Sequence, residues 1–132
     1  MQQKKKAEER TRASFDSAKA LYDQDKFEEA ADVFRAVIKN RPKGEESKKS
    51  QFYLGESLFS AKDYASSTLT FSEFIKSHPK DTLVPTAIYR QAQAFRSLGK
   101  PKEAKLFYQE LIERFPKSPL ASKAKAEQRK LK

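Results

Sequence analysis

The chain contains no cysteine and only one histidine, one methionine and three glycines among its 132 residues. Without cysteine, it has neither a disulfide framework nor a thiolate metal site. No apolar run approaches the roughly 20 residues that a membrane-spanning helix needs. The three glycines, Gly44, Gly55 and Gly99, stand singly and form no phosphate-binding loop. The length suffices for one domain with a core of its own, and not for two.

The N-terminal segment, residues 1–12, starts with basic residues but continues without an apolar stretch. It is therefore not an intact signal peptide. If the natural protein is exported, we expect this chain to be its processed or truncated form, with Met1 added. We interpret residues 1–12 as a charged tail or the remnant of a linker.

The net charge of +10 is concentrated at the two ends of the chain. Residues 1–12 carry a net charge of +3 and residues 117–132 carry +5, which leaves only +2 for residues 13–116. The central part is thus a mixed, solvated surface. Binding of nucleic acid or anionic lipid through the tails is the weakest of the functional hypotheses.

The only histidine, His78, directly precedes Pro79. A lone histidine at a helix end is typical of a charge partner for the helix terminus, not of a catalyst. One histidine without cysteines cannot form a zinc cluster. The acidic pair Glu28 and Glu29 is explained by the favourable effect of negative charge near a helix N-terminus. We expect no enzymatic activity, no metal site and no cofactor.

The sequence repeats itself at an offset of 37 residues. Each repeat carries Pro-Lys at the same position, and the preceding isoleucines, aromatic residues and small residues share the register. The matching sets are Pro42, Pro79 and Pro116; Ile38, Ile75 and Ile112; Phe34, Phe71 and Tyr108; Ala30, Ser67 and Ala104; Ala20, Ser57 and Ala94; Ala18, Gly55 and Ala92; and Leu21, Leu58 and Phe95. So many matches without a gap indicate a true internal repeat.

Within each repeat the apolar residues follow the helical period and not the alternation of a strand. Short breaks separate the helices of each pair, which predicts antiparallel neighbours. Asp81 and Ser118 are the expected N-caps of the helices that follow a Pro-Lys pair, with Pro119 as a first helical residue. The predicted helices span residues 9–23, 27–40, 46–61, 64–77, 82–98, 101–114 and 119–131.

This pattern resembles the tetratricopeptide repeat (TPR), in which small and large apolar residues alternate along a helical hairpin that ends at a proline. The residues that fall on the signature positions are Leu54, Gly55, Leu58, Tyr64, Ser67, Phe71 and Pro79. The resemblance implies an all-α, right-handed superhelix of three hairpins, about residues 11–44, 48–81 and 85–118. A polar capping helix over residues 119–131 would complete a single domain spanning 13–131.

One branch of the TPR proteins resembles this chain in more detail. The run Tyr53–Ser57 is similar to a Tyr-Trp-Leu-Gly-Glu run in the C-terminal domain of the cell division coordinator CpoB (YbgF) family, and the linker Phe115–Ser118 is similar to a linker of that domain. In that family an N-terminal coiled coil carries trimerisation. It is absent from this chain, so the oligomeric state stays open.

Some positions depart from the family pattern. Pro101 stands where an aromatic residue is expected, although proline is tolerated in the first turn of a helix. Asp25 and Lys62 occupy the break that Gly99 fills in the third repeat. Aspartate tolerates a left-handed conformation there, and lysine tolerates it less well.

In a solenoid of hairpins, the first helix of each hairpin lines the concave side, which usually binds the partner. A stripe at i, i+4 and i+7 on each first helix is therefore the predicted groove, with Arg90 as an additional charge that steers an acidic segment. The groove residues are Phe15, Lys19, Tyr22, Phe52, Glu56, Phe59, Tyr89, Arg90, Gln93 and Arg96. An equally weighted alternative is that Phe15, Phe52 and Tyr89 only pack neighbouring hairpins together.

Some TPR proteins hold an acidic C-terminal tail through a carboxylate clamp of lysine, asparagine and arginine residues. The corresponding positions here are Phe15, Lys19, Tyr53, Thr86 and Arg90. Only Arg90 fits the clamp, so we exclude this mode of binding.

These observations predict a non-catalytic module that binds a protein or peptide. The CpoB resemblance implies a periplasmic protein that binds TolA and a peptidoglycan synthase of the Tol–Pal setting, and that coordinates envelope constriction in cell division with wall synthesis. The alternative is a repeat adaptor with another client, either of the BamD type in outer-membrane assembly or cytoplasmic.

Overall fold

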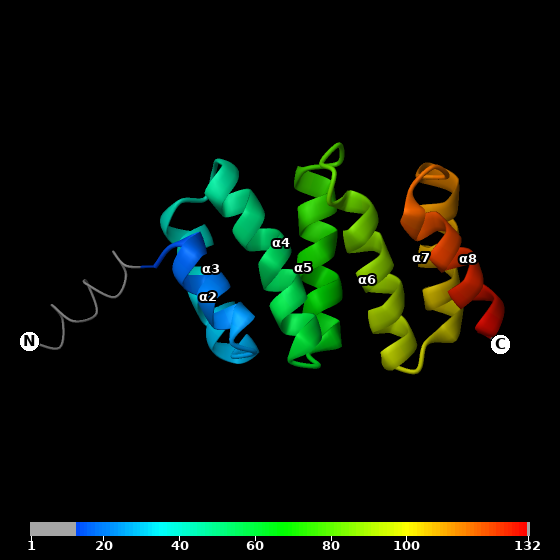
Figure 1. Cartoon of the computed structure of the whole chain (residues 1–132), viewed down its shortest axis with the longest axis horizontal. Coiled ribbons are helices and arrows are strands. Elements are labelled where there is room, and N and C mark those ends of the chain that lie inside the picture. Colours follow the sequence, from blue (N-terminus) through cyan, green and yellow to red (C-terminus); the bar gives the residue numbers. More distant parts are fainter. Residues whose placement is uncertain (1–12, 132) are drawn as a thin grey trace, which may run out of the picture. The chain divides into compact units, whose positions relative to one another are not determined.

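The computed structural model describes residues 13–131 and contains seven helices and no strand within that range. The helices are α2 (Phe15–Asp23), α3 (Phe27–Asn40), α4 (Glu45–Ser60), α5 (Tyr64–Ser77), α6 (Val84–Ser97), α7 (Pro101–Arg114) and α8 (Pro119–Lys130) (Figure 1). Six of the predicted helices are confirmed with ends within two residues.

The start of α2 differs from the prediction of a helix from residue 9. Ser14 is extended and forms a capping box, in which its hydroxyl accepts from the Ser17 amide and the Ser17 hydroxyl accepts from the Ser14 amide. This reciprocal cap satisfies amides that have no partner at a helix N-terminus, and so the helix begins at Phe15. The predicted residues 9–12 lie outside the described range.

The contacts divide the chain into two compact units, with the boundary between Lys62 and Asp63. In the first unit, α3 packs against both α2 and α4. Phe34 of α3 is fully buried at the centre of this core. The other buried residues of the cluster are Ala18, Ala30, Ala31, Leu54 and Leu58.

In the second unit, α6 packs against α5 and α7, and α8 lies against α7 with a smaller contact to α6 (Figure 1). The helix pairs α2–α3 and α6–α7 are therefore both antiparallel hairpins in contact, as predicted. The largest buried side chains of the second unit are Phe71, Phe74, Ile88, Tyr108 and Leu111. Alanines at 92, 94 and 104 are also fully buried and allow the helices to approach closely.

Three turns that join paired helices share one unusual backbone conformation. Asp25, Lys62 and Gly99 have φ angles of 61°, 67° and 73°. The left-handed conformation ends each preceding helix. At each of the three positions the amide of the residue donates a hydrogen bond to a carbonyl in the last turn of that helix, and at Asp25 and Gly99 the amide of the next residue does so too. The prediction that these three positions are equivalent breaks is confirmed.

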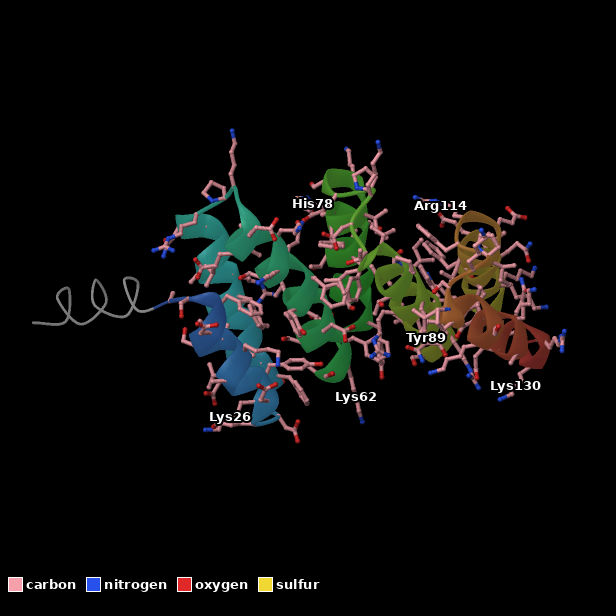
Figure 2. All side chains as sticks on the ribbon, turned by 45° about the horizontal axis from the view of Figure 1, so that its top comes forward. Lys26, Lys62, His78, Tyr89, Arg114 and Lys130 are labelled. Atoms are coloured by element: carbon pink, nitrogen blue, oxygen red, sulfur yellow. The ribbon has the colours of Figure 1, made fainter. Side chains whose placement is uncertain are left out.

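Lys62 is the residue least suited to this conformation, since it has neither glycine's freedom nor the short polar side chain of aspartate. Its side chain is exposed and points away from the ribbon (Figure 2). We expect Lys62→Gly to raise the free energy of unfolding by about 0.5–1 kcal/mol, because relief of the left-handed strain exceeds the added entropy of the unfolded chain. Urea unfolding measures this change. Lys43, an exposed lysine, does not have a positive φ, so Lys43→Gly should not stabilise the protein; equal gains would contradict the explanation.

The caps of the later helices agree only in part with the sequence prediction. Ser118 caps α8, with its hydroxyl accepting from the Leu120 amide, and Pro119 is the first helical residue, as predicted. The prediction for Asp81 was wrong: the N-cap of α6 is Leu83. The Asp81 carboxylate instead accepts from the Leu83 amide at 2.9 Å, which stabilises a separate turn before the helix.

Along residues 13–131, no helix has the length and apolar character to cross a membrane.

Candidate protein-binding surface

Three aromatic side chains from α2 and α4 meet around one lysine in the first unit. We call Phe15, Lys19, Tyr22 and Tyr53 the aromatic–lysine surface. The Tyr53 ring contacts both Phe15 and Tyr22 edge-on, with centroids 5.5 and 5.6 Å apart. All four residues are half-buried, so each still has part of its side chain open to solvent.

Lys19 carries the charge of this surface. Its Nζ lies 5.7 Å from the centre of the Tyr22 ring and 5.3 Å from that of Tyr53, within the range of a cation–π interaction. The ammonium also donates to the Asp23 carboxylate at 2.7 Å. That hydrogen bond raises the pKa of Lys19, so the side chain stays charged at neutral pH.

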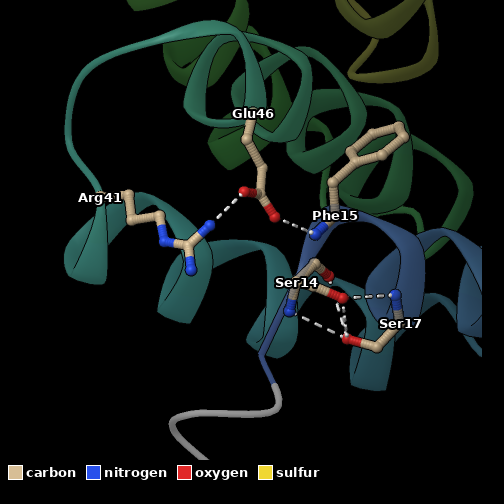
Figure 3. Close-up of polar contacts among 5 residues, drawn as sticks. All are labelled: Ser14, Phe15, Ser17, Arg41 and Glu46. Carbon is tan, nitrogen blue, oxygen red and sulfur yellow. Dashed lines mark hydrogen bonds and ion pairs between the residues drawn. The ribbon is translucent and has the colours of Figure 1, made fainter.

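The sequence fixes these positions because α2 is anchored to the start of α4. The Glu46 carboxylate accepts from the Phe15 amide at 2.9 Å and from Arg41 at 2.7 Å (Figure 3). The Phe15 amide is one of the helix N-terminal donors that lack a partner within the helix. Glu46 thus holds the beginning of α2, and with it Phe15, against the α3–α4 connection.

This contact predicts an acid-sensitive anchor. The hydrogen bond from Phe15 and the Arg41 charge lower the pKa of Glu46 from its usual 4.5. The stabilisation is therefore complete above pH 4.5 and is lost as the pH falls through the lowered pKa. We expect Glu46→Gln to accelerate exchange of the Phe15 amide hydrogen at pH 7 and to remove this acid-dependent step. Hydrogen exchange by NMR tests it; Glu45→Gln, which only loses a contact to Lys48, is the control.

The predicted groove residues of α4 are less exposed to solvent than those of α2. Phe52 and Glu56 are buried, with 4% and 8% of their surface exposed, and Phe59 is half-buried. Phe52 contacts the Tyr53 ring edge-on at 5.4 Å. Tyr53 is therefore the residue of α4 whose ring contacts the aromatic residues of α2, and the buried Phe52 packs against it.

The predicted groove residues of α6 form a second set in the other unit. Arg90 donates to Gln93 at 2.8 Å on the same helix. Arg96 forms an ion pair with Glu127 of α8 at 2.7 Å. Tyr89 contacts Tyr108 of α7 edge-on at 5.7 Å and is half-buried (Figure 2). Phe15 contacts Tyr53 of the next hairpin, as the packing alternative expects, whereas the contact between Tyr89 and Tyr108 lies within one hairpin.

Two residues of these surfaces were not found by sequence reasoning. Tyr53 lies one position beyond the i, i+4, i+7 stripe, which selects Phe52. Glu127 belongs to a helix that was read only as a polar cap. A comparison of charges across the predicted neighbours, Arg96 on one helix and Glu127 at the end of another, would have indicated this pair.

Within residues 13–131, no three histidine, cysteine, aspartate or glutamate side chains gather in a way that could hold a metal ion. His78 is the C-cap of α5, and its ring lies 5.5 Å from that of Phe74. What the geometry offers is an aromatic surface with Lys19 against its two tyrosines and Lys49 over the Phe15 ring at 5.7 Å.

The hairpins and their shared register define the class of the chain as a TPR-type helical repeat protein. Its sequence matches the YfiO family, described as an outer membrane lipoprotein, over residues 7–132, and it therefore belongs to that family. No curated protein matches. The TPR-type prediction is confirmed, whereas the CpoB branch gains no support from these comparisons.

Solved structures agree on the fold. The type III secretion translocator chaperone SycD of Yersinia enterocolitica is 20% identical, with a TM-score of 0.70; the match covers 87% of this chain and 78% of SycD. The TPR domain of Arabidopsis FLU is 22% identical, with a TM-score of 0.68; the match covers 79% of this chain and 92% of that domain. At such identities the likeness shows the fold alone.

Proposed function

We propose that the chain is a non-catalytic protein-binding module of the bacterial cell envelope, and that it holds its partner on the aromatic–lysine surface. The observation that carries the proposal is the Lys19 ammonium between the rings of Tyr22 and Tyr53. Rigid, partly exposed aromatic side chains around a charge are typical of residues that contribute strongly to protein binding.

The chemistry of this surface selects a particular kind of segment. Phe15, Tyr22 and Tyr53 offer apolar ring surface, and Lys19 attracts a carboxylate in competition with Asp23. The fitting partner is a helix or extended peptide with an apolar side chain next to an acidic one. A single segment of this size binds with about micromolar affinity, or roughly −8 kcal/mol.

Membership of a family of outer membrane lipoproteins supports a place in the envelope, with the periplasm as the compartment. The same membership favours a client in outer-membrane assembly, the BamD-type role. The second candidate is the Tol–Pal role, with TolA and a peptidoglycan synthase as partners. It is supported by the similarity of the run Tyr53–Ser57 to the CpoB family.

Site-specific photo-crosslinking in living cells tests the surface and the client together. A photoreactive amino acid replaces Asp23, which borders the surface next to Lys19, in one variant and Arg35 in a second. Arg35 is an exposed residue of α3 and serves as the control. We expect a discrete adduct from position 23 and not from position 35. Mass spectrometry then assigns the adduct to outer-membrane assembly proteins, to Tol–Pal proteins or to cytoplasmic proteins.

The outcomes separate the parts of the proposal. Equal adducts from positions 23 and 35, or no adduct from position 23, would overturn the surface. An adduct confined to cytoplasmic proteins would overturn the envelope role and leave the surface standing. The wider groove formed with Phe59, Gln93 and Arg96 stays a prediction, as does the single domain over residues 13–131.

A further inference from the structure

A second, chemically different surface lies in the second unit, on the outer side of α7. Lys102, Lys105, Leu106 and Gln109 are spaced by three and four residues and so share one stripe of the helix. Leu106 is 69% exposed, the highest value among the exposed large apolar residues of the described chain. Leu106 thus has Lys102 and Lys105 on one flank, while Glu103 and Glu110 lie on its other flank.

The end of α8 extends the stripe. The Gln128 side chain donates to the Lys105 carbonyl at 3.2 Å and to Gln109 at 3.0 Å, which places the last turns of α8 beside the first half of α7. Glu127 faces α6. Helical spacing places Lys125 and Arg129 on the opposite side of α8. Both are exposed. The four cations therefore border one strip of surface around Leu106.

The four cations of this strip form no ion pair within the described residues. Glu110 and Glu127 pair with other cations, and Glu103, next to Lys102, still leaves the strip with a net positive charge. Residues 98–131 carry nine basic and four acidic side chains. A free strip of positive charge fits a partner of negative charge.

We propose that this basic–leucine strip, Lys102, Lys105, Leu106, Lys125 and Arg129, binds an anionic lipid surface. Lysine and arginine attract acidic headgroups, and a protruding leucine inserts between them at the boundary with the acyl chains. The proposal is independent of the protein partner, because the aromatic–lysine surface belongs to the other unit. It gives the module a preferred contact with the membrane beside which it works.

The chain itself provides a matched control for the leucine. Leu69 of α5 occupies the position 37 residues before Leu106 and is 68% exposed. Its neighbours on the helix stripe are Ala65, Ser72 and Glu73, without a lysine. Leu106 has lysines beside it as well as acidic residues, whereas Leu69 has no cation among these neighbours, and the two leucines hardly differ in exposure.

Sedimentation with lipid vesicles tests the proposal on the whole chain. Vesicles contain phosphatidylcholine either alone or with about 30 mol % phosphatidylglycerol, since only the second attract basic residues. We expect binding only to the anionic vesicles. The double variant Lys102→Gln/Lys105→Gln should lose roughly 10- to 30-fold in affinity, at about fivefold for each charge. Leu106→Ser should weaken binding several-fold, and Leu69→Ser should leave it unchanged.

The controls keep the result specific. Lys76→Gln/Lys80→Gln removes two exposed lysines of the same unit outside the strip and should have little effect. Circular dichroism confirms that each variant folds. Unchanged binding by the Lys102/Lys105 variant, or equal losses for the two leucine variants, would overturn the strip. The chain could instead bind a single-stranded oligonucleotide and no vesicles, with an affinity that depends on Lys102 and Lys105 but not on Leu106. That result would show that the strip binds a soluble polyanion and not a lipid surface.

Discussion

Replacing Tyr108 by alanine is expected to lower the free energy of unfolding by about 3–5 kcal/mol, whereas replacing it by phenylalanine should leave stability unchanged or raise it by up to about 1 kcal/mol. Tyr108 is fully buried, so removal of its ring leaves a cavity. Its hydroxyl is buried and has no hydrogen-bond partner among the described residues. The equivalent residues of the other repeats, Phe34 and Phe71, have no hydroxyl at all.

Chemical unfolding of the two variants at neutral pH measures these differences, and alkaline pH provides a second readout. Burial raises the pKa of Tyr108 from 10 to about 12. The neutral hydroxyl therefore contributes fully below pH 10, and its contribution is lost as the pH rises through 12. Tyr108→Phe should lack this alkaline step. A phenylalanine variant as unstable as the alanine variant would show that the hydroxyl does have a partner.

The second large effect is expected at Gln91, which links α6 to α5. Its side-chain amide is buried and donates to the Thr68 carbonyl at 3.0 Å and to the Ser72 hydroxyl at 2.8 Å. Gln91→Ala removes both hydrogen bonds and leaves a cavity, at a cost of about 2–3 kcal/mol. Gln91→Leu fills the space with the residue that the preceding repeat has there, Leu54, and should lose less than about 1 kcal/mol.

Thermal and urea unfolding distinguish these two variants, with Gln93→Ala as the control on the same helix. Gln93 is half-buried and bonds only within its own helix, so its loss should change stability by less than about 0.5 kcal/mol. If Gln91→Leu proves as unstable as Gln91→Ala, the hydrogen bonds and not the volume hold α5 against α6. If all three variants are equal, the amide link has no stabilising role.

The repeat made most of this fold predictable. Matching residues at an offset of 37 located the helices, and the prolines marked where they end. The start of α2 was wrong because the capping box of Ser14 and Ser17 combines two ordinary serines, which composition and period do not reveal. The N-cap of α6 was wrong because Asp81 caps a turn instead of a helix, which depends on the backbone conformation of the two residues after it.

The site was less predictable than the fold. Helical spacing identified Phe15, Lys19 and Tyr22 on one stripe, and the structure brings these three together. The same spacing selected Phe52 in place of Tyr53, because periodicity within one helix does not determine how the next helix is rotated against it. That rotation depends on packing between helices, here on the anchoring of the Phe15 amide by Glu46.

The three left-handed turns have a practical consequence for protein engineering. Aspartate, lysine and glycine occupy the same place and produce nearly the same φ angle, so the main chain of the turn is largely independent of its sequence. One turn cassette should therefore be transferable between all three places without altering the hairpins. An array extended by further copies of the 37-residue segment would need only this one turn within each hairpin, with glycine at its centre, beside the Pro-Lys linkers between hairpins.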